Sequence, residues 1–392
     1  MTARIPRVAL VVCDSFGVGG APDAAAYGDA HADTLGNTAR VVGGLDAPHL
    51  ADLGLGHLTT ISGVPPRASD GTAHGTCCER SAGKDTTTGH WEMAGIVLDR
   101  PFPLYPEGFP PEIIGPFSAA IGRDVLGNVP ASGTVIIEEL GAEHLATGRP
   151  IVYTSGDSVF QIACHTDVVD LDTLYAWCRT ARALLVGPHG VGRVIARPFD
   201  GVPGSFRRRP ERRDYSVPPP GPTLCDRALE AGVAVYGVGK IQDIFAGRGM
   251  TEATYSSSDA DGIDRTIAFL GRPGPALVFT NLVDFDSKYG HRSDPEGYAR
   301  NVEALDRRIP DLLAALDGGV LLLTGDHGCD PTDVSTDHTR ERTPLLVAGL
   351  DGPGRDLGQR PTFADIGATI ADLLGVPWDG LAGTSVAGEL GR

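Results

Sequence analysis

Near its start the chain reads Val8-Ala9-Leu10-Val11-Val12-Cys13-Asp14, an apolar run that stops at an acid. The same arrangement returns twice in the second half of the sequence. Residues 277–285 lead to Asp286, and residues 320–325 lead to Asp326. In an open α/β sheet, ligands bind in the crevice outside the carboxyl ends of the strands. The sequence therefore predicts that the three aspartates face one active edge.

Three histidines follow these acids at short distances. His291 comes five residues after Asp286, His327 directly follows Asp326, and His338 comes eleven residues after His327. An isolated Asp after a strand is usually a turn or cap residue, so the joint pattern carries the interpretation. Six such donors are too many for one tetrahedral zinc ion. They fit two divalent cations, which can clamp a phosphoryl group during in-line displacement.

The composition is that of a globular chain of two domains. Its 392 residues are more than one hydrophobic core usually serves. Lys+Arg 33 against Asp+Glu 50 gives a net charge of −17, which argues against binding to nucleic acid or to an anionic membrane surface. A small anionic substrate is compatible with this charge, because bound metal ions supply local positive charge.

Other features of the sequence point to the cytoplasm. No apolar run approaches the roughly 20 residues of a membrane span. The first strand follows the N-terminus at once, so we expect no signal peptide. The seven cysteines are an odd number and contain no pair of Cys-x-x-Cys units, so we expect reduced thiols. Cys77 and Cys78 are interpreted as structural, and Cys329 as a neighbour of the metal site rather than a ligand.

Strands and helices alternate along the chain with one interruption. Further strands are expected at 233–237 and 344–348, and helices at 295–316, with Asp294 as N-cap, and at 363–374. This is the pattern of a doubly wound α/β sheet. Between about residues 101 and 217 this alternation is interrupted, and proline-rich stretches bracket strand-like runs at 151–154 and 191–196. We expect a core domain in two parts, 1–100 and 218–392, and an inserted cap domain at 101–217 that closes over the active edge.

Two glycine-rich stretches imitate nucleotide-binding motifs without completing them. Residues 17–20 follow the first strand, but Pro22 occupies the third glycine position of a dinucleotide fingerprint. Residues 237–240 resemble the end of a P-loop, but Ile241 stands where Ser or Thr must hold magnesium. Neither stretch is interpreted as a nucleotide site.

The segment Gly83-Lys84-Asp85-Thr86-Thr87-Thr88-Gly89-His90-Trp91-Glu92 contains candidate nucleophiles. A threonine hydroxyl is a weak nucleophile until a metal or a base removes its proton. A loop that leads into a helix also offers backbone N–H groups to an anion. An ordinary capping loop would have the same composition, so the residues alone leave both interpretations open.

Several motifs together resemble those of the phosphopentomutase family in the alkaline phosphatase superfamily. Their order and spacing agree over nearly the whole chain, in residues 12–17, 83–92, 283–291, 326–328, 337–341 and 362–369. The resemblance implies an alkaline-phosphatase-like doubly wound core sheet with an inserted α+β cap domain. The sequence departs from the usual family residues at Cys13, Thr87 and Cys329, and none of these departures removes a ligand.

The resemblance also implies roles for individual residues. Thr86 would be the residue that carries the phosphoryl group. The site would hold two divalent metal ions, most often manganese in this family, and manganese suits carboxylate and imidazole donors. One metal would be held by Asp286, His291 and His338, and the other by Asp14, Asp326 and His327. The sugar phosphate would be bound in the cap by Ser155, Asp157, Arg193 and Arg208, and in the core by Lys240. Guanidinium groups match phosphate geometry, but most of the arginines between 207 and 213 are expected to be surface residues.

The activity implied is an intramolecular phosphotransfer. Ribose 1-phosphate and ribose 5-phosphate, or their 2-deoxy forms, would interconvert through phospho-Thr86 and a pentose 1,5-bisphosphate, and a sugar bisphosphate would prime the enzyme. A metal-dependent phosphatase is the first alternative, which the long cap disfavours. A phosphoglycerate mutase of the same superfamily is the second, but its carrier is typically Ser. An inert metal-binding sensor is the third, disfavoured because all ligands and Thr86 are present.

Overall fold

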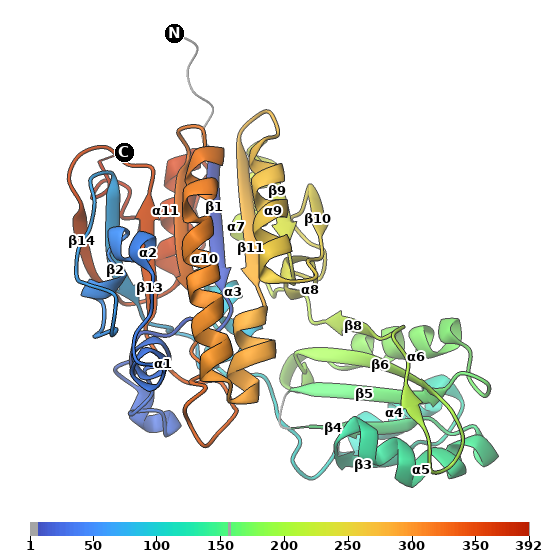
Figure 1. The fold of residues 1–392 in the computed structure, drawn as a ribbon. Coiled ribbons are helices and arrows are strands. Elements are labelled where there is room, and N and C mark those ends of the chain that lie inside the picture. Colours follow the sequence, from blue (N-terminus) through green and yellow to red (C-terminus); the bar gives the residue numbers. More distant parts are fainter. Residues whose placement is uncertain (1–6, 156–157, 392) are drawn as a thin grey trace. The chain divides into compact units, whose positions relative to one another are not determined.

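The computed structural model describes residues 7–155 and 158–391, and Asp157 of the predicted substrate contacts lies outside them. The chain folds into two compact units. One contains the residues up to Pro101 and those from Pro219 onward, and the other is Phe102–Pro218. The second unit, coloured mainly green in Figure 1, is therefore an insertion in the first.

The first unit is built on an eight-stranded sheet with strand order β10-β9-β11-β1-β12-β13-β2-β14. The strands are β1 Arg7–Cys13, β2 Thr72–Cys77, β9 Ala234–Val238, β10 Glu252–Thr254, β11 Ala276–Leu282, β12 Val320–Gly325, β13 Thr343–Ala348 and β14 Arg355–Arg360. Strand β1 is parallel to both β11 and β12, and Cys13 is in register with Leu282 and Gly325. The chain thus leaves all three strands at the same edge. Strand β13 is antiparallel to both of its neighbours.

Helices cover both faces of this sheet (Figure 1). One face carries α1 Thr34–Val42, α2 Pro48–Asp52, α9 Asp259–Leu270 and α10 Pro295–Ala315, and the other carries α3 Thr86–Met93, α7 Leu224–Glu230 and α11 Ala364–Leu374, with the short α8 Ile241–Ile244 packed on α3. Strands buried on both faces must be apolar almost throughout, which explains the runs that the sequence shows. The predicted N-cap of α10 is confirmed, because the Asp294 carboxylate accepts a hydrogen bond from the N–H of Gly297 at 2.8 Å.

The strand predicted at 277–285 ends earlier than expected. Strand β11 ends at Leu282, and Asp286 lies in a π-helical turn at Phe285–Tyr289. The cause is a reciprocal pair of hydrogen bonds at the end of the strand. The Asp259 carboxylate accepts from the N–H of Asp284 at 2.9 Å, and the Asp284 carboxylate accepts from the N–H of Asp259 at 3.1 Å. These bonds turn the chain away from the sheet.

The second unit has a six-stranded mixed sheet of order β3-β4-β5-β6-β7, with β8 also paired to β6. Its elements are β3 Leu126–Pro130, β4 Ile151–Thr154, β5 Val159–His165, β6 Arg193–Asp200, β7 Arg207–Arg208, β8 Arg213–Ser216, α4 Pro111–Ile121, α5 Gly133–Thr147 and α6 Leu171–Leu184. Apolar side chains of α4 and α6 form one core with the sheet, and those of α5 form another on the opposite face. This unit is therefore a layered α+β domain.

Two further properties follow from the described residues. No helix among them is both long enough and apolar enough to span a membrane. All seven cysteines are buried, and none forms a disulfide.

Candidate active site

Three acids converge at the edge where β1, β11 and β12 end. Asp14 and Asp326 are fully buried, and Asp286 is 4% exposed. The N–H of Ser15 donates to Asp326 Oδ1 at 3.0 Å, which ties the end of β1 to the end of β12. Buried carboxylates are costly unless positive charge compensates them. This edge therefore requires a cationic partner.

All three histidines present Nε2 to these acids, because each uses Nδ1 on a backbone carbonyl. His291 Nδ1 lies 2.6 Å from the carbonyl of Thr336, His338 Nδ1 lies 3.0 Å from that of Lys84, and His327 Nδ1 lies 3.1 Å from that of Gly328. A carbonyl only accepts, so Nδ1 carries a ring proton, and Nε2 is the nitrogen that faces the carboxylates and that a cation could bind once it is deprotonated. Fixing the tautomer in this way is typical of metal-binding histidines.

The donors form two groups. In the first, the Nε2 atoms of His291 and His338 each lie 3.3 Å from Asp286 Oδ1 and 3.1 Å from one another. In the second, His327 Nε2 lies 3.4 Å from Asp14 Oδ1 and 3.6 Å from Asp326 Oδ2. The structure thus brings together the residues that the resemblance implies for each metal ion, and Asp286, His327 and His338 also lie close enough to one another to share one ion.

Each group contains a carboxylate oxygen that fits a bound cation. Asp286 Oδ1 and Asp326 Oδ2 are buried and accept no hydrogen bond of normal geometry from the described residues, although histidine nitrogens lie 3.3 Å from the first and 3.2 Å from the second. Orphaned acceptors of this kind are unfavourable unless something positive reaches them. The oxygen and imidazole donors suit divalent ions such as manganese or zinc. The residues present thus fit two divalent metal ions.

Burial and neighbouring charges shift the pKa values of Asp14 and His338 in this cluster. Burial, reinforced by the Asp326 charge, raises the pKa of Asp14 to about 7. Burial opposes the charged form of His338, but the Asp286 carboxylate outweighs it and raises the pKa of His338 to about 9. In this cluster bound protons therefore offset part of the negative charge that metal cations would otherwise neutralise. The binding of divalent cations should therefore release protons.

Cys329 lies beside the first group, and its Sγ is 3.9 Å from His291 Nδ1. Asp286, His291 and Cys329 are close enough to share one ion. Burial, followed by the Asp286 charge, raises the pKa of this thiol well above its ordinary value, which disfavours the thiolate that a metal would need. We therefore keep the interpretation of Cys329 as a neighbour.

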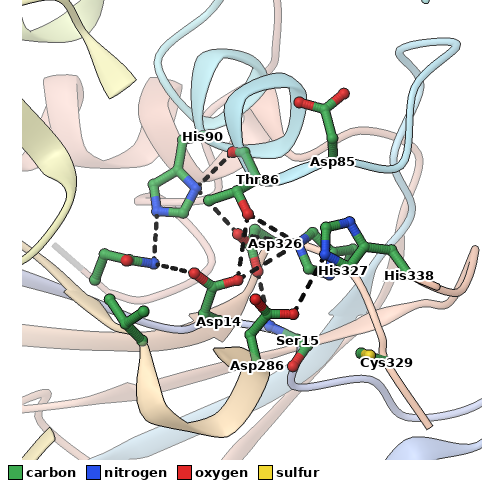
Figure 2. A network of polar contacts seen from close by, with 12 residues as sticks. Asp14, Ser15, Asp85, Thr86, His90, Asp286, Asp326, His327, Cys329 and His338 are labelled. Carbon is green, nitrogen blue, oxygen red and sulfur yellow. Dashed lines mark hydrogen bonds and ion pairs between the residues drawn. The ribbon is translucent and has the colours of Figure 1, made fainter. Parts of the chain in front are cut away.

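The candidate nucleophile is the first residue of α3. The Asp85 carboxylate caps this helix by accepting from the N–H of Thr88 at 3.1 Å, and the Thr88 hydroxyl also bonds to Asp85. The Thr86 hydroxyl instead lies 3.4 Å from Asp14 Oδ1 and 3.3 Å from His327 Nε2 (Figure 2). A hydroxyl at a helix N-terminus and beside a metal group is well placed for phosphoryl chemistry.

Three further polar side chains lie beside Asp14 and Thr86. Lys240, predicted as a substrate contact, has its Nζ 3.1 Å from Asp14 Oδ2. The amide nitrogen of Asn281 lies 3.2 Å from the same oxygen, and the ring of His90 lies beneath Thr86. His90 stands in the Thr86 motif, which is a signal in the sequence. Asn281 lies inside β11, and nothing around it in the sequence distinguishes it.

The predicted sugar-phosphate contacts Ser155, Arg193 and Arg208 belong to the second unit. Ser155 directly follows β4, and Arg193 begins β6, with its Nη1 3.5 Å from Asp214 Oδ2. Arg208 is exposed in β7. Three nearby arginines pair with surface acids, as expected of surface residues: Arg207 with Asp200, Arg209 with Asp200 and Glu211, and Arg212 with Asp214.

A match to a family model shows the class of protein to which the chain belongs. Residues 6–378 match the model of the metalloenzyme superfamily. The phosphoglycerate mutase of Leishmania mexicana, a solved structure, has 13% sequence identity and a TM-score of 0.47, with 98% of each chain covered. The match to the family model extends over almost the whole chain, so this protein is a metalloenzyme of that superfamily.

The family within this class follows from curated relatives. A phosphopentomutase of Anaeromyxobacter dehalogenans is 58% identical over 394 residues, with 100% of both chains covered. Phosphopentomutases of Desulfitobacterium hafniense and Acetivibrio thermocellus are 52% and 51% identical, each over 98% of this chain and 99% of the relative. The chain belongs to the phosphopentomutase family, whose members are isomerases.

Proposed function

We propose that this protein interconverts pentose 1-phosphates and pentose 5-phosphates of the ribose or deoxyribose series by a phosphoryl relay through Thr86. One observation carries the proposal: the Thr86 hydroxyl lies within 3.4 Å of both Asp14 and His327, while Thr88 is occupied by Asp85. Family membership supports the substrate class, because the relatives are phosphopentomutases.

Two divalent ions, manganese foremost, would be held by the two ligand groups, Asp286, His291 and His338 in one and Asp14, Asp326 and His327 in the other. Bound there, they would neutralise charge on the phosphoryl group and favour the ionised Thr86 hydroxyl. The chain itself contributes the N–H groups of the first turn of α3. The N-terminus of this helix is the positive end of the helix dipole and attracts phosphate. Lys240, beside Asp14, adds a cation on the same side.

The relay has two transfers. Phospho-Thr86 gives its phosphoryl group to the free hydroxyl of a bound pentose phosphate, which forms a pentose 1,5-bisphosphate and leaves Thr86 as a hydroxyl. The bisphosphate then reorients and returns its other phosphoryl group to Thr86 Oγ1, so that the isomer leaves. A sugar bisphosphate supplied from outside would prime dephosphorylated enzyme in the same way. Catalysis of this kind depends mainly on positioning and electrostatics.

The second unit would recognise the sugar phosphate. Ser155, Arg193 and Arg208 are its proposed contacts, together with Asp157, which lies outside the described residues. Arginine binds phosphate through paired N–H groups, which supports this part of the proposal.

The relay is tested at Thr86. Thr86→Ala should abolish isomerisation while metal binding and folding persist, because the hydroxyl contributes little to the core. Incubating dephosphorylated wild-type enzyme with a sugar bisphosphate should raise its activity, and peptide mapping should find the phosphate on Thr86. Thr87→Ala is the matched control and should stay active. Normal isomerisation by Thr86→Ala, or a label on Thr87 or Thr88, would disprove the relay, and release of free phosphate without isomer would indicate a phosphatase.

A further inference from the structure

His90 lies directly behind the candidate nucleophile and is fully buried. It is the fifth residue of α3, four positions after Thr86. Helical side chains lean toward the helix N-terminus, so a residue at this position can reach the carbonyl of Thr86. Its Nδ1 lies 2.8 Å from that carbonyl oxygen and 3.2 Å from Asp326 Oδ2 (Figure 2). One ring nitrogen thus contacts both the nucleophile's own residue and a predicted metal ligand.

The other ring nitrogen leads to the second strand end. His90 Nε2 lies 3.3 Å from the side-chain nitrogen of Asn281, and this nitrogen is also 3.2 Å from Asp14 Oδ2. The amide nitrogen can only donate, so Nε2 accepts. The Thr86 carbonyl can only accept, so Nδ1 carries the proton. These partners therefore specify the neutral Nδ1–H form of His90.

Packing holds the ring in this position. The ring of Phe279 in β11 stacks on His90 with centroids 5.7 Å apart and an interplanar angle of 16°. Helix α3 also approaches Asp326 closely at Gly89, where a Cβ would lie 2.5 Å from the Asp326 carbonyl oxygen. These contacts fix the positions of the His90 ring and of helix α3 relative to Asp326 at the end of β12.

We infer that His90 is a positioning residue that holds the Thr86 helix in register with Asp326 directly and with Asp14 through Asn281. It aligns the nucleophile with the predicted metal ligands and is not itself in contact with substrate. A histidine that only fills the core would need the ring and its packing but no particular ring nitrogen. The inference rests on the proposed relay for its consequence in catalysis, but its effect on the ligand carboxylates can be measured without turnover.

Three substitutions separate these possibilities. His90→Phe keeps the ring and removes both polar contacts. His90→Asn keeps an N–H near the position of Nδ1, and His90→Gln keeps a polar group near that of Nε2. The probe is Mn²⁺ alone, titrated into metal-free protein and followed by electron paramagnetic resonance. Loss of a group that orients a ligand typically weakens metal binding by about 10–100-fold.

We expect His90→Phe to weaken Mn²⁺ binding by roughly that 10–100-fold factor and to lower kcat with little change in KM. His90→Gln keeps only the indirect link to Asp14, so its losses should be nearly as large. His90→Asn should restore most of both losses. Wild-type Mn²⁺ affinity in His90→Phe, or equal affinities in the Asn and Gln variants, would overturn the inference. If His90→Phe does not fold, the comparison of Asn with Gln still decides. Failure of the relay itself would appear in the Thr86 peptide map and would leave these titrations unchanged.

Discussion

At the scale of single residues, the site is defined by which atom of each side chain is left available. Backbone carbonyls accept hydrogen bonds from Nδ1 of His291, His327 and His338, so the Nε2 atom of each ring faces the carboxylates. Asp286 Oδ1 and Asp326 Oδ2, which accept no hydrogen bond of normal geometry from the described residues, lie within 3.6 Å of these Nε2 atoms. Residue identities in the sequence indicate ligands, but only these partners determine which nitrogen and which oxygen can bind a cation.

Asp326→Asn tests this account at one ligand. The variant keeps the shape of the side chain and removes its charge, so Mn²⁺ binding should weaken by more than the roughly 10–100-fold loss caused by an orienting group, and activity should fall with it. Exhaustive chelation should likewise abolish wild-type activity, and Mn²⁺ should restore it. Asp311→Asn, at an exposed ion pair with Arg308, is the control and should change neither quantity. Full activity of metal-free wild-type protein would refute the metal requirement.

At the scale of elements, a short helix is docked on a strand end. Helix α3 places Thr86 beside Asp14 and His327, and Gly89 allows its backbone to approach Asp326. The loop before α3 is fixed by Arg340, which is buried and donates to Glu79 and to the carbonyls of Ser81 and Gly83. The position of the nucleophile therefore depends on contacts made by parts of the chain far from it in sequence.

Gly89→Ala should disturb this docking. The added methyl group would lie 2.5 Å from a backbone oxygen, which cannot move as the end of a flexible side chain could. Overpacking of this kind costs typically about 1–3 kcal/mol, so the melting temperature should fall, and activity should fall because Thr86 is displaced. Gly115→Ala is a matched control, since that helical position in α4 has nothing within 4 Å and Ala is favoured in helices by about 1 kcal/mol. Equal melting temperatures for Gly89→Ala and wild type would contradict the steric argument.

At the scale of the whole molecule, the predicted site residues are distributed over two compact units. All six predicted metal ligands and Thr86 belong to the first unit, whereas Arg193 and Arg208 belong to the second. Each unit has its own sheet and its own apolar cores. If the second unit binds the sugar phosphate as proposed, a change in it should alter substrate binding without altering metal binding.

Arg193→Ala tests that division. If this arginine binds the sugar phosphate, KM should rise by roughly 10- to 150-fold, because a charged hydrogen bond is worth about 1.5–3 kcal/mol, while Mn²⁺ affinity stays at the wild-type value. Arg207→Ala is the control, since its side chain is 80% exposed and pairs with Asp200. Steady-state kinetics and a Mn²⁺ titration on the same preparations give both readouts. An unchanged KM would remove Arg193 from the site, and a lost metal would show that the two functions are not separable.

The sequence by itself determined several of the core strands, the acids near their ends and the residue types of the site. Apolar runs buried on both faces of a sheet have a strong local signature, so β1, β12 and the N-cap of α10 could be predicted from residues 8–14, 320–326 and 294–297. The Thr86 motif was recognisable by resemblance. These properties depend on local periodicity and on residue chemistry, and both can be read along the chain.

Only the tertiary structure decided how these residues meet. The early end of β11 depends on Asp259 and Asp284, which are 25 residues apart, and the contact of His90 with Asn281 spans 191 residues. The antiparallel direction of β13 and the approach of Gly89 to Asp326 were likewise beyond local patterns. Such features follow from close packing and from the pairing of buried polar groups between distant segments. The sequence therefore determined the chemistry of the site, and the packing of distant segments determined its geometry.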